Sequence, residues 1–286
     1  MTAAPPRTRA RRSLRPFWLI PSFYLICFVV LAVLETGVAF VAGPAANNPR
    51  DITFQWLALA SVAVATWIML RIEKQPWSFV GLGREAAAPP LVINGALLGA
   101  ATIGTASIAL LAIHMLRIEA APAGSWLGAA GQSAASLLPA AFFEELFMRG
   151  FVFAVLRRAG GWRLALIVTS VVFGLLHAWN PGADAESILA VIVAGFFLGG
   201  ILLATGSLYA AGAAHFAWNW VMAGALHIAV SGIASSDPDY RTIETGPDWL
   251  TGGPWGPEGG LAAVAAMFVA IFYLYGRYLR GMEHRK

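Results

Sequence analysis

Two adjacent glutamates lie inside a long apolar run of this sequence, AASLLPAAFFEELFMRGFVFAVL, and Arg149 follows close behind them. A charge at membrane depth costs at least about 2.5 kcal/mol, so such side chains usually belong to a working site. Glu145 and Arg149 are four residues apart, which predicts an ion pair on one helix face. Glu144 points about 100° away and has Met148 at its own i+4 position, so its carboxylate stays free to react.

Two histidines on later helices add matching chemistry. His177 follows Phe173 by four residues in FGLLH, and His215 precedes Asn219 by four residues in HFAWN. This spacing predicts that each pair shares one face of its helix. One histidine on an apolar face is usually a packed residue, but two of them, with an asparagine and an unpaired glutamate, predict a shared intramembrane site. For Glu144, Glu145 and Arg149, the alternative to a working site is a structural ion pair that ties two helices together.

These groups suit the hydrolysis of a peptide bond. Glu144 can take a proton from a water molecule that His177 helps to hold, while His215 and Asn219 donate hydrogen bonds to the developing oxyanion. Alternatively, Glu144, His177 and His215 could ligate Zn²⁺ with an open fourth position, although the usual H-E-x-x-H signature is missing. We favour the reading without a cofactor, because Asn219 makes better sense as an oxyanion donor.

Composition indicates a membrane protein. Of the 286 residues, 58% are hydrophobic and 12% are charged, whereas soluble domains carry about 25% charged residues. A spanning helix needs about 20 apolar residues. Candidate spans cover residues 17–42, 52–70, 91–116, 132–156, 164–179, 187–204, 207–230 and 261–279. The sequence therefore predicts an all-α polytopic membrane protein, with about eight transmembrane helices in one bundle.

The chain divides into two parts. Residues 1–16 are rich in Arg and Pro and are expected to form a disordered cytoplasmic tail, while residues 17–286 form a single transmembrane domain. Most of the 19 Lys and Arg residues fall on one side of the predicted spans, and only Arg50, Arg117 and Arg241 fall on the other. Positive charge marks the cytoplasmic side. We therefore expect an integral protein of a bacterial plasma membrane with both termini in the cytoplasm.

For several other residues the sequence predicts no catalytic role. The segment 231–260 is rich in Gly, Pro and acids and is expected to be a flexible surface loop rather than a lid. Its Trp249 and Trp255 are expected to lie at the lipid headgroups. His114 and His227, near helix ends, are expected to be reached by solvent.

The three motifs together resemble those of the CPBP intramembrane proteases, also called the Abi or CAAX-protease family. The family motifs E-E-x-x-x-R, F-x-x-x-H and H-x-x-x-N correspond to residues 144–149, 173–177 and 215–219. They occur in the family's order, and residues 130–225 carry the similarity and form the expected core of the site. The resemblance implies an endopeptidase in which Glu and His activate water and His and Asn form an oxyanion hole. The family includes the eukaryotic endopeptidase that removes the last three residues of prenylated proteins.

The expected partners are membrane lipid and a protein or peptide substrate, lipidated or not. Nucleic acid is not an expected partner, because topology explains the net charge of +4. Two other functions stay open: a non-proteolytic membrane scaffold or immunity protein that keeps the motifs for stability, and a proton-coupled transporter that uses the Glu and His groups as a relay. The transporter gains no support from internal repeats.

Overall fold

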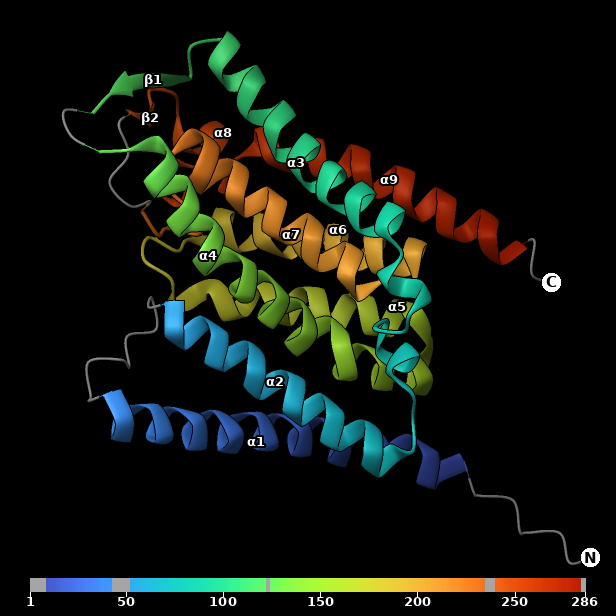
Figure 1. Ribbon diagram of the computed structural model, residues 1–286. Helices are drawn as coiled ribbons and strands as arrows, with labels where there is room; N and C mark the ends of the chain where they lie inside the picture. The colour runs from blue at the N-terminus through green and yellow to red at the C-terminus, as the bar shows by residue number, and fades with distance from the viewer. Residues whose placement is uncertain (1–8, 43–51, 122–123, 235–239, 284–286) are drawn as a thin grey trace, which may run out of the picture.

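In a computed structural model of the protein, the described residues are 9–42, 52–121, 124–234 and 240–283. They form a bundle of helices that run along one common direction (Figure 1). The longer helices are α1 (Arg9–Ala42), α2 (Ile52–Glu73), α3 (Pro89–Ala112), α4 (Trp126–Glu145), α5 (Phe151–Leu176), α6 (Ala185–Thr205), α7 (Leu208–Trp220) and α9 (Leu261–Glu283). The start of α1 and the end of α9 lie at the same end of the bundle (Figure 1).

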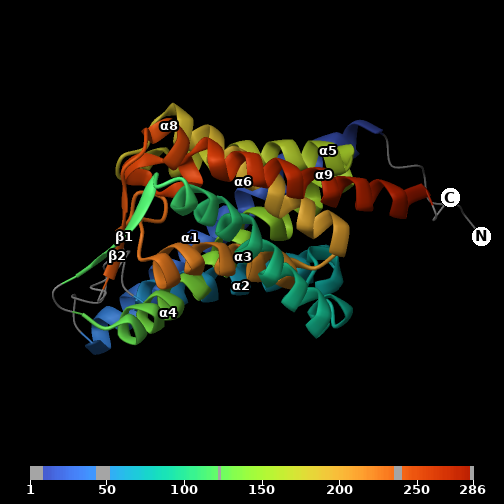
Figure 2. The ribbon, with the colours of Figure 1, turned by 90° about the horizontal axis from the view of Figure 1, so that it is seen from above.

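Small elements cover the opposite end. Strands β1 (Leu116–Ala120) and β2 (Tyr240–Glu244) pair antiparallel there, with Leu116 opposite Glu244, and both views show them beyond the helix ends (Figures 1 and 2). The short helix α8 (Asp248–Thr251) follows β2. Single 3-10 turns cover His177–Trp179, Gly253–Trp255 and Pro257–Gly259, whereas the 3-10 turns Trp77–Val80 and Glu85–Ala87 connect α2 to α3 at the other end of the bundle (Figure 1).

Among the described residues, six helices are long and apolar enough to cross a membrane. The chain is therefore an all-α polytopic membrane protein, but the expected number of eight spans is not confirmed. Two expected spans, 132–156 and 164–179, lie within one helical run, Trp126–Trp179. A third, 207–230, is divided between the 13-residue α7 and a π-helix, Val221–Leu226. Helix α7 alone is shorter than the about 20 residues that a span needs.

The run Trp126–Trp179 reverses its direction at Gly161. The φ of 86° and ψ of 175° at this residue lie outside the helical region, and glycine adopts a positive φ without a steric penalty. A straight helix would separate Glu144 from His177 by about 50 Å, at about 1.5 Å per residue. Their side chains instead lie 4.0 Å apart, so the second arm returns to the depth of Glu144.

Helix α7 packs against α3, α4 and α6, and glycines bring α3 very close to it. Gly95 and Gly99 of α3 face Ala210 and Ala214 of α7, and a Cβ atom at Gly99 would lie only 2.1 Å from the carbonyl oxygen of Ala214. Such small-residue contacts hold membrane helices together through close backbone packing. Because Ala214 directly precedes His215, this contact also fixes the depth of that histidine.

Polar caps determine where two helices of the site region begin. Asp184 and Ser187 form a capping box at the start of α6, and the hydrogen bonds from Ser187 hold the pKa of the Asp184 carboxyl below its usual value. Gly206, in the left-handed conformation, ends α6. Ser207 then caps α7 by accepting a hydrogen bond from the backbone N–H of Ala210. Side-chain caps of this kind satisfy backbone groups that a helix end leaves unpaired.

The N-terminal region differs from the expected disordered tail over part of its length. Helix α1 begins at Arg9, inside the segment 1–16 that was expected to be disordered. Residues 1–8 lie outside the described residues.

The described part of segment 231–260 packs into the protein, which contradicts the expected flexible surface loop. Trp255 is only 2% exposed, so the expectation that it lies at the lipid headgroups is wrong, whereas Trp249 is exposed. Gly232 makes the packing possible, because a Cβ atom there would lie 1.9 Å from the carbonyl oxygen of Pro181. The segment therefore lies directly on the turn that follows His177.

The two isolated histidines also differ from each other. His114 is exposed, as expected. His227 is buried, contrary to expectation, and its Nδ1 donates to the carbonyl oxygen of Ala223 one turn earlier. Burial follows from its position at the end of the π-helix, where Tyr240 of β2 packs against its ring.

Candidate active site

Three of the residues expected at the site meet at one carboxylate oxygen. Oε2 of Glu144 lies 3.8 Å from Nε2 of His215 and 4.0 Å from Nε2 of His177. Glu144 comes from the end of α4, His177 from the end of α5 and His215 from the middle of α7. Among the described residues this Oε2 is buried without a hydrogen-bond partner, although the Glu144 side chain as a whole is 33% exposed. The free carboxylate thus faces two imidazole nitrogens.

The neighbouring carboxylate has the opposite environment. Glu145 forms a fully buried ion pair with Arg149, with Oε1 and Nη1 2.5 Å apart. Arg149 also donates from Nη2 to the carbonyl oxygen of Gly195 at 3.3 Å, and its guanidinium lies 4.4 Å from the centre of the Phe173 ring. A cation over an aromatic face is an attractive contact. Phe173 therefore connects the first motif with the second.

Glu145 has a second contact that the sequence did not reveal. Its Oε1 lies 3.1 Å from Nδ1 of His215. Because an ionised carboxylate can only accept a hydrogen bond, Nδ1 of His215 carries the proton. This contact turns Nε2 of His215 toward Glu144, so Glu145 orients a histidine as well as pairing with Arg149.

His177 is oriented by its own helix. Its Nδ1 lies 2.8 Å from the carbonyl oxygen of Phe173, and since a carbonyl can only accept, Nδ1 is the donor. In the neutral ring, Nε2 then presents its lone pair toward Glu144. The distances from Glu144 to both Nε2 atoms exceed the usual hydrogen-bond range of about 2.7–3.2 Å and are within reach through one water molecule.

Two π-helices interrupt the helices that carry the site. Leu146–Gly150 follows Glu145 directly, and Val221–Leu226 begins two residues after Asn219. π-Helices are rare and occur frequently at functional sites. No residue pattern in either motif signals them.

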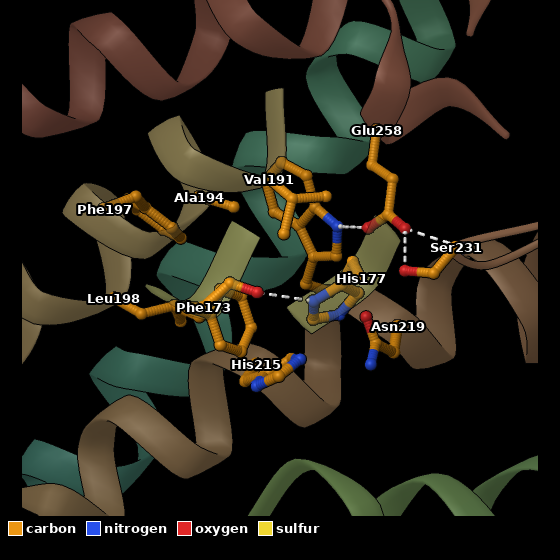
Figure 3. A pocket seen from close by; sticks show the side chains of 11 residues that line it. Phe173, His177, Val191, Ala194, Phe197, Leu198, His215, Asn219, Ser231 and Glu258 are labelled. Atoms are coloured by element: carbon orange, nitrogen blue, oxygen red, sulfur yellow. Dashed lines mark hydrogen bonds between the residues drawn. The ribbon is translucent and has the colours of Figure 1, made fainter. Parts of the chain in front are cut away.

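Asn219 lines a small cavity of about 30 Å³ together with both histidines (Figure 3). A cavity needs roughly 10–15 Å³ to hold one water molecule, so this one has room for a water beside His177, His215 and Asn219. The Asn219 side chain is buried and makes no hydrogen bond within the described parts of the chain, which leaves its amide available to a ligand. The remaining lining residues are Phe173, Val191, Ala194, Phe197, Leu198, Trp218, Ser231 and Glu258.

Glu258, Ser231 and Trp218 were missed as site residues. Glu258 and Ser231 reach the cavity from the segment expected to be a surface loop, and Trp218 belongs to the third motif's helix. A signal for Glu258 does exist in the sequence: it is an acid in GPEGGLAAV, directly at the edge of the last apolar run.

For the zinc alternative, Glu144, His177 and His215 would be the ligands. Zinc binds nitrogen and oxygen atoms at about 2.0–2.2 Å. Within the described residues, no group of three or more His, Cys, Asp or Glu side chains has a geometry that could hold a metal ion. The arrangement therefore does not fit the zinc alternative without movement of these side chains.

The fold and the site define an integral membrane protein in which two His and an Asn line one cavity, and a Glu from a third helix faces both imidazole rings. Residues 126–221 match the family model described as Type II CAAX prenyl endopeptidase Rce1-like. This range holds all three motifs and about a third of the chain, and it confirms the resemblance to the CPBP or CAAX-protease family. The match indicates a protease of the CAAX type. No curated protein and no solved structure matches the chain.

Proposed function

We propose that this protein is an intramembrane endopeptidase that hydrolyses peptide bonds through a water molecule activated by Glu144. The observation that carries the proposal is the approach of two imidazole Nε2 atoms to one free carboxylate oxygen, at 3.8 and 4.0 Å. A nucleophilic water needs a base and an orienting group, and this arrangement offers both.

In the proposed reaction, Glu144 accepts a proton from water while the Nε2 lone pair of His177 holds that water. The water oxygen forms a bond to the carbonyl carbon, and the carbonyl electrons move to its oxygen. Asn219 donates from Nδ2 to this oxyanion, and His215 in its protonated form donates from Nε2. The C–N bond then breaks, and the amine nitrogen takes the proton from Glu144. One water and one peptide bond thus yield a carboxylic acid and an amine.

The proposed substrate is a membrane-associated protein or peptide. The matching family is described by its action on CAAX prenyl proteins, and a buried site inside a helix bundle suits a substrate that is itself held at the membrane. Whether a lipid group on the substrate is needed is decided by comparing matched peptides with and without a prenylated cysteine.

We further propose that the end of the bundle at Gly161 faces the cytoplasm. Arg157, Arg158 and Arg163 flank this reversal, and positive charge favours the cytoplasmic side. The start of α1 and the end of α9 lie at the same end (Figure 1), so the proposal also puts both chain ends in the cytoplasm. Single cysteines are introduced at either end of the bundle in the Cys27→Ser background, and their labelling in intact cells by a reagent that does not cross the membrane tests this orientation.

The decisive experiment compares the purified wild type with Glu144→Gln on a peptide library, with mass spectrometry of the products and metal analysis of the same samples. We expect products from the wild type alone. Glu186→Gln is the matched control, because Glu186 is an exposed acid at the start of α6. Equal cleavage by Glu144→Gln would overturn the proposal. Cleavage that requires zinc and is lost with a chelator would instead assign Glu144, His177 and His215 as ligands.

A further inference from the structure

Glu258 is a buried acid that the proposed reaction does not use. It lies in the 3-10 turn Pro257–Gly259, just before α9, and its exposed fraction is 8%. Its carboxyl group reaches the cavity that also contains His177, His215 and Asn219 (Figure 3). A buried carboxyl group is costly unless donors satisfy it, so its hydrogen-bond partners indicate its role.

Three donors satisfy this carboxyl group, one from Trp218 of α7 and two from Ser231 in the segment after it. The indole N–H of Trp218 donates to Oε2 at 2.9 Å. The backbone N–H and the hydroxyl of Ser231 donate to Oε1 at 2.7 and 2.6 Å. Figure 3 shows these contacts as dashed lines. Since all three groups are donors, a carboxylate fits them, whereas an amide would have to place its own N–H₂ against one of them.

Ser231 extends the hydrogen-bond network of Glu258 to the end of α5, the helix that leads to His177. Its carbonyl oxygen accepts a hydrogen bond from Nδ2 of Asn180 at 3.1 Å. Asn180 lies three residues after His177, where α5 has ended. Glu258 therefore joins the end of α5 to α7, the helix that carries His215 and Asn219.

The helix around Trp218 has a local reason to need such an anchor. Helix α7 ends at Trp220, and the π-helix Val221–Leu226 begins at the next residue. The hydrogen-bond pattern changes at this point from i→i−4 to i→i−5, so the regular ladder does not by itself set the rotation of the side chains. The Trp218 ring also packs on Phe197, with centroids 5.9 Å apart, but packing is not directional. The hydrogen bond from the Trp218 indole to Glu258 is directional and therefore fixes the orientation of the ring.

We propose that Glu258 is a positioning residue of the active site. By holding Trp218 and Ser231, it fixes the cavity wall from which the adjacent Asn219 reaches the substrate carbonyl. This inference rests on the proposed function, because the role of Asn219 belongs to that proposal. It makes two predictions: the hydrogen-bond state of the Trp218 indole depends on Glu258, and the loss of Glu258 acts on catalysis through Asn219.

The first test needs no activity. The indole N–H resonances are recorded by NMR in the full chain labelled with ¹⁵N-tryptophan, and Trp218→Phe assigns the Trp218 signal among the 11 tryptophans. A carboxylate acceptor moves an indole proton downfield, so we expect an upfield shift of the Trp218 signal in Glu258→Gln. Glu186→Gln should leave it unchanged. A Trp218 signal that does not respond to Glu258→Gln would overturn the proposal.

The second test separates positioning from a general structural effect. We expect Glu258→Gln to lower kcat about tenfold with KM nearly unchanged, which is less than the about 10²–10³-fold loss for removing an oxyanion donor outright. In the Asn219→Ala background, Glu258→Gln should cost nothing further, because residues that act as a unit are not additive. An equal tenfold loss in that background would overturn the proposal, as would a change in KM alone.

A third comparison keeps the proposal testable if Glu258→Gln folds poorly. In the Trp218→Phe background the indole N–H is absent, so the side-chain N–H₂ introduced by Glu258→Gln no longer faces another donor. The double variant should therefore be no less stable than Trp218→Phe. The control for the loss of an indole is Trp249→Phe, because Trp249 is exposed and lies in the same segment as Glu258, residues 231–260. If Glu258→Gln destabilises the Trp218→Phe variant as much as it destabilises the wild type, the contact between Glu258 and Trp218 is contradicted.

The failures of the two proposals can be told apart. If the wild type cleaves no peptide, the endopeptidase proposal and the positioning role fall together, and a responsive Trp218 signal then reports a structural contact only. If the wild type cleaves but the Trp218 signal ignores Glu258, only the positioning proposal is overturned.

Discussion

The two sides of the E-E pair differ in what they are built to do. On one side, Glu145 and Arg149 are fully buried and paired, and Arg149 also contacts the Phe173 ring and the carbonyl oxygen of Gly195. On the other side, Glu144 is a third exposed, and its buried oxygen makes no hydrogen bond with any described residue. Adjacent residues of the same type thus divide the work, because a one-residue step on a helix turns the side chain by about 100°. We therefore expect the paired side to stabilise the fold, and the proposed function assigns the reaction to the free side.

The largest expected effect comes from breaking the paired side. Arg149→Ala would leave Glu145 buried without its cation, and removing one partner of a buried pair costs about 3–5 kcal/mol. We expect little folded protein, measured by size-exclusion chromatography of the detergent extract. The double variant Glu145→Gln/Arg149→Met removes both charges and should recover the folded level. Arg149→Ala at normal level with normal activity would show that the pair is not structural.

The next effect comes from the free side. Glu144→Gln keeps the shape of the side chain but removes the base, and general base catalysis contributes about 10²–10⁴-fold. We expect kcat to fall by about 10³-fold while the thermal unfolding temperature stays near that of the wild type. A large loss of stability in this variant would contradict the division between the two glutamates.

A smaller effect is expected at Asn219. Asn219→Ala removes one donor to the oxyanion, for which losses of about 10²–10³-fold in kcat are typical. KM should change little, because the hydrogen bond forms mainly in the transition state. Steady-state kinetics on one cleaved peptide measure both constants. A rise in KM with unchanged kcat would indicate that Asn219 binds the substrate and does not stabilise the oxyanion.

The smallest effect concerns a third acid, Glu244 of β2, which lies outside the membrane-spanning helices. Burial, together with the nearby Asp248 carboxylate, raises the pKa of Glu244 from 4.5 to about 8. The folded protein therefore holds a proton there that the unfolded chain has released, so stability falls as the pH rises from about 4.5 to about 8. We expect the unfolding temperature of the wild type to fall between pH 6 and pH 9 more than that of Glu244→Gln. Parallel pH profiles for the two proteins would contradict the raised pKa.

Local patterns account for the parts of the site that could be predicted. The apolar runs predicted membrane helices, and the spacing of four predicted the pair of Glu145 with Arg149, which the structure has at 2.5 Å. Both features depend on residues within one or two helical turns. The same local reasoning predicted the wrong surroundings for Trp255 and His227, because burial there comes from segments remote in the sequence.

The sequence by itself determined the class of protein, the helical pairs and the motif order, since hydropathy and helical periodicity are written in neighbouring residues. Only the tertiary structure decided which groups meet. The contact of Glu145 with His215 joins residues 70 positions apart, and that of Trp218 with Glu258 joins residues 40 positions apart. The reversal at Gly161 and the two π-helices decide where these side chains point. These features depend on how whole helices pack, and no spacing rule within one helix contains that information.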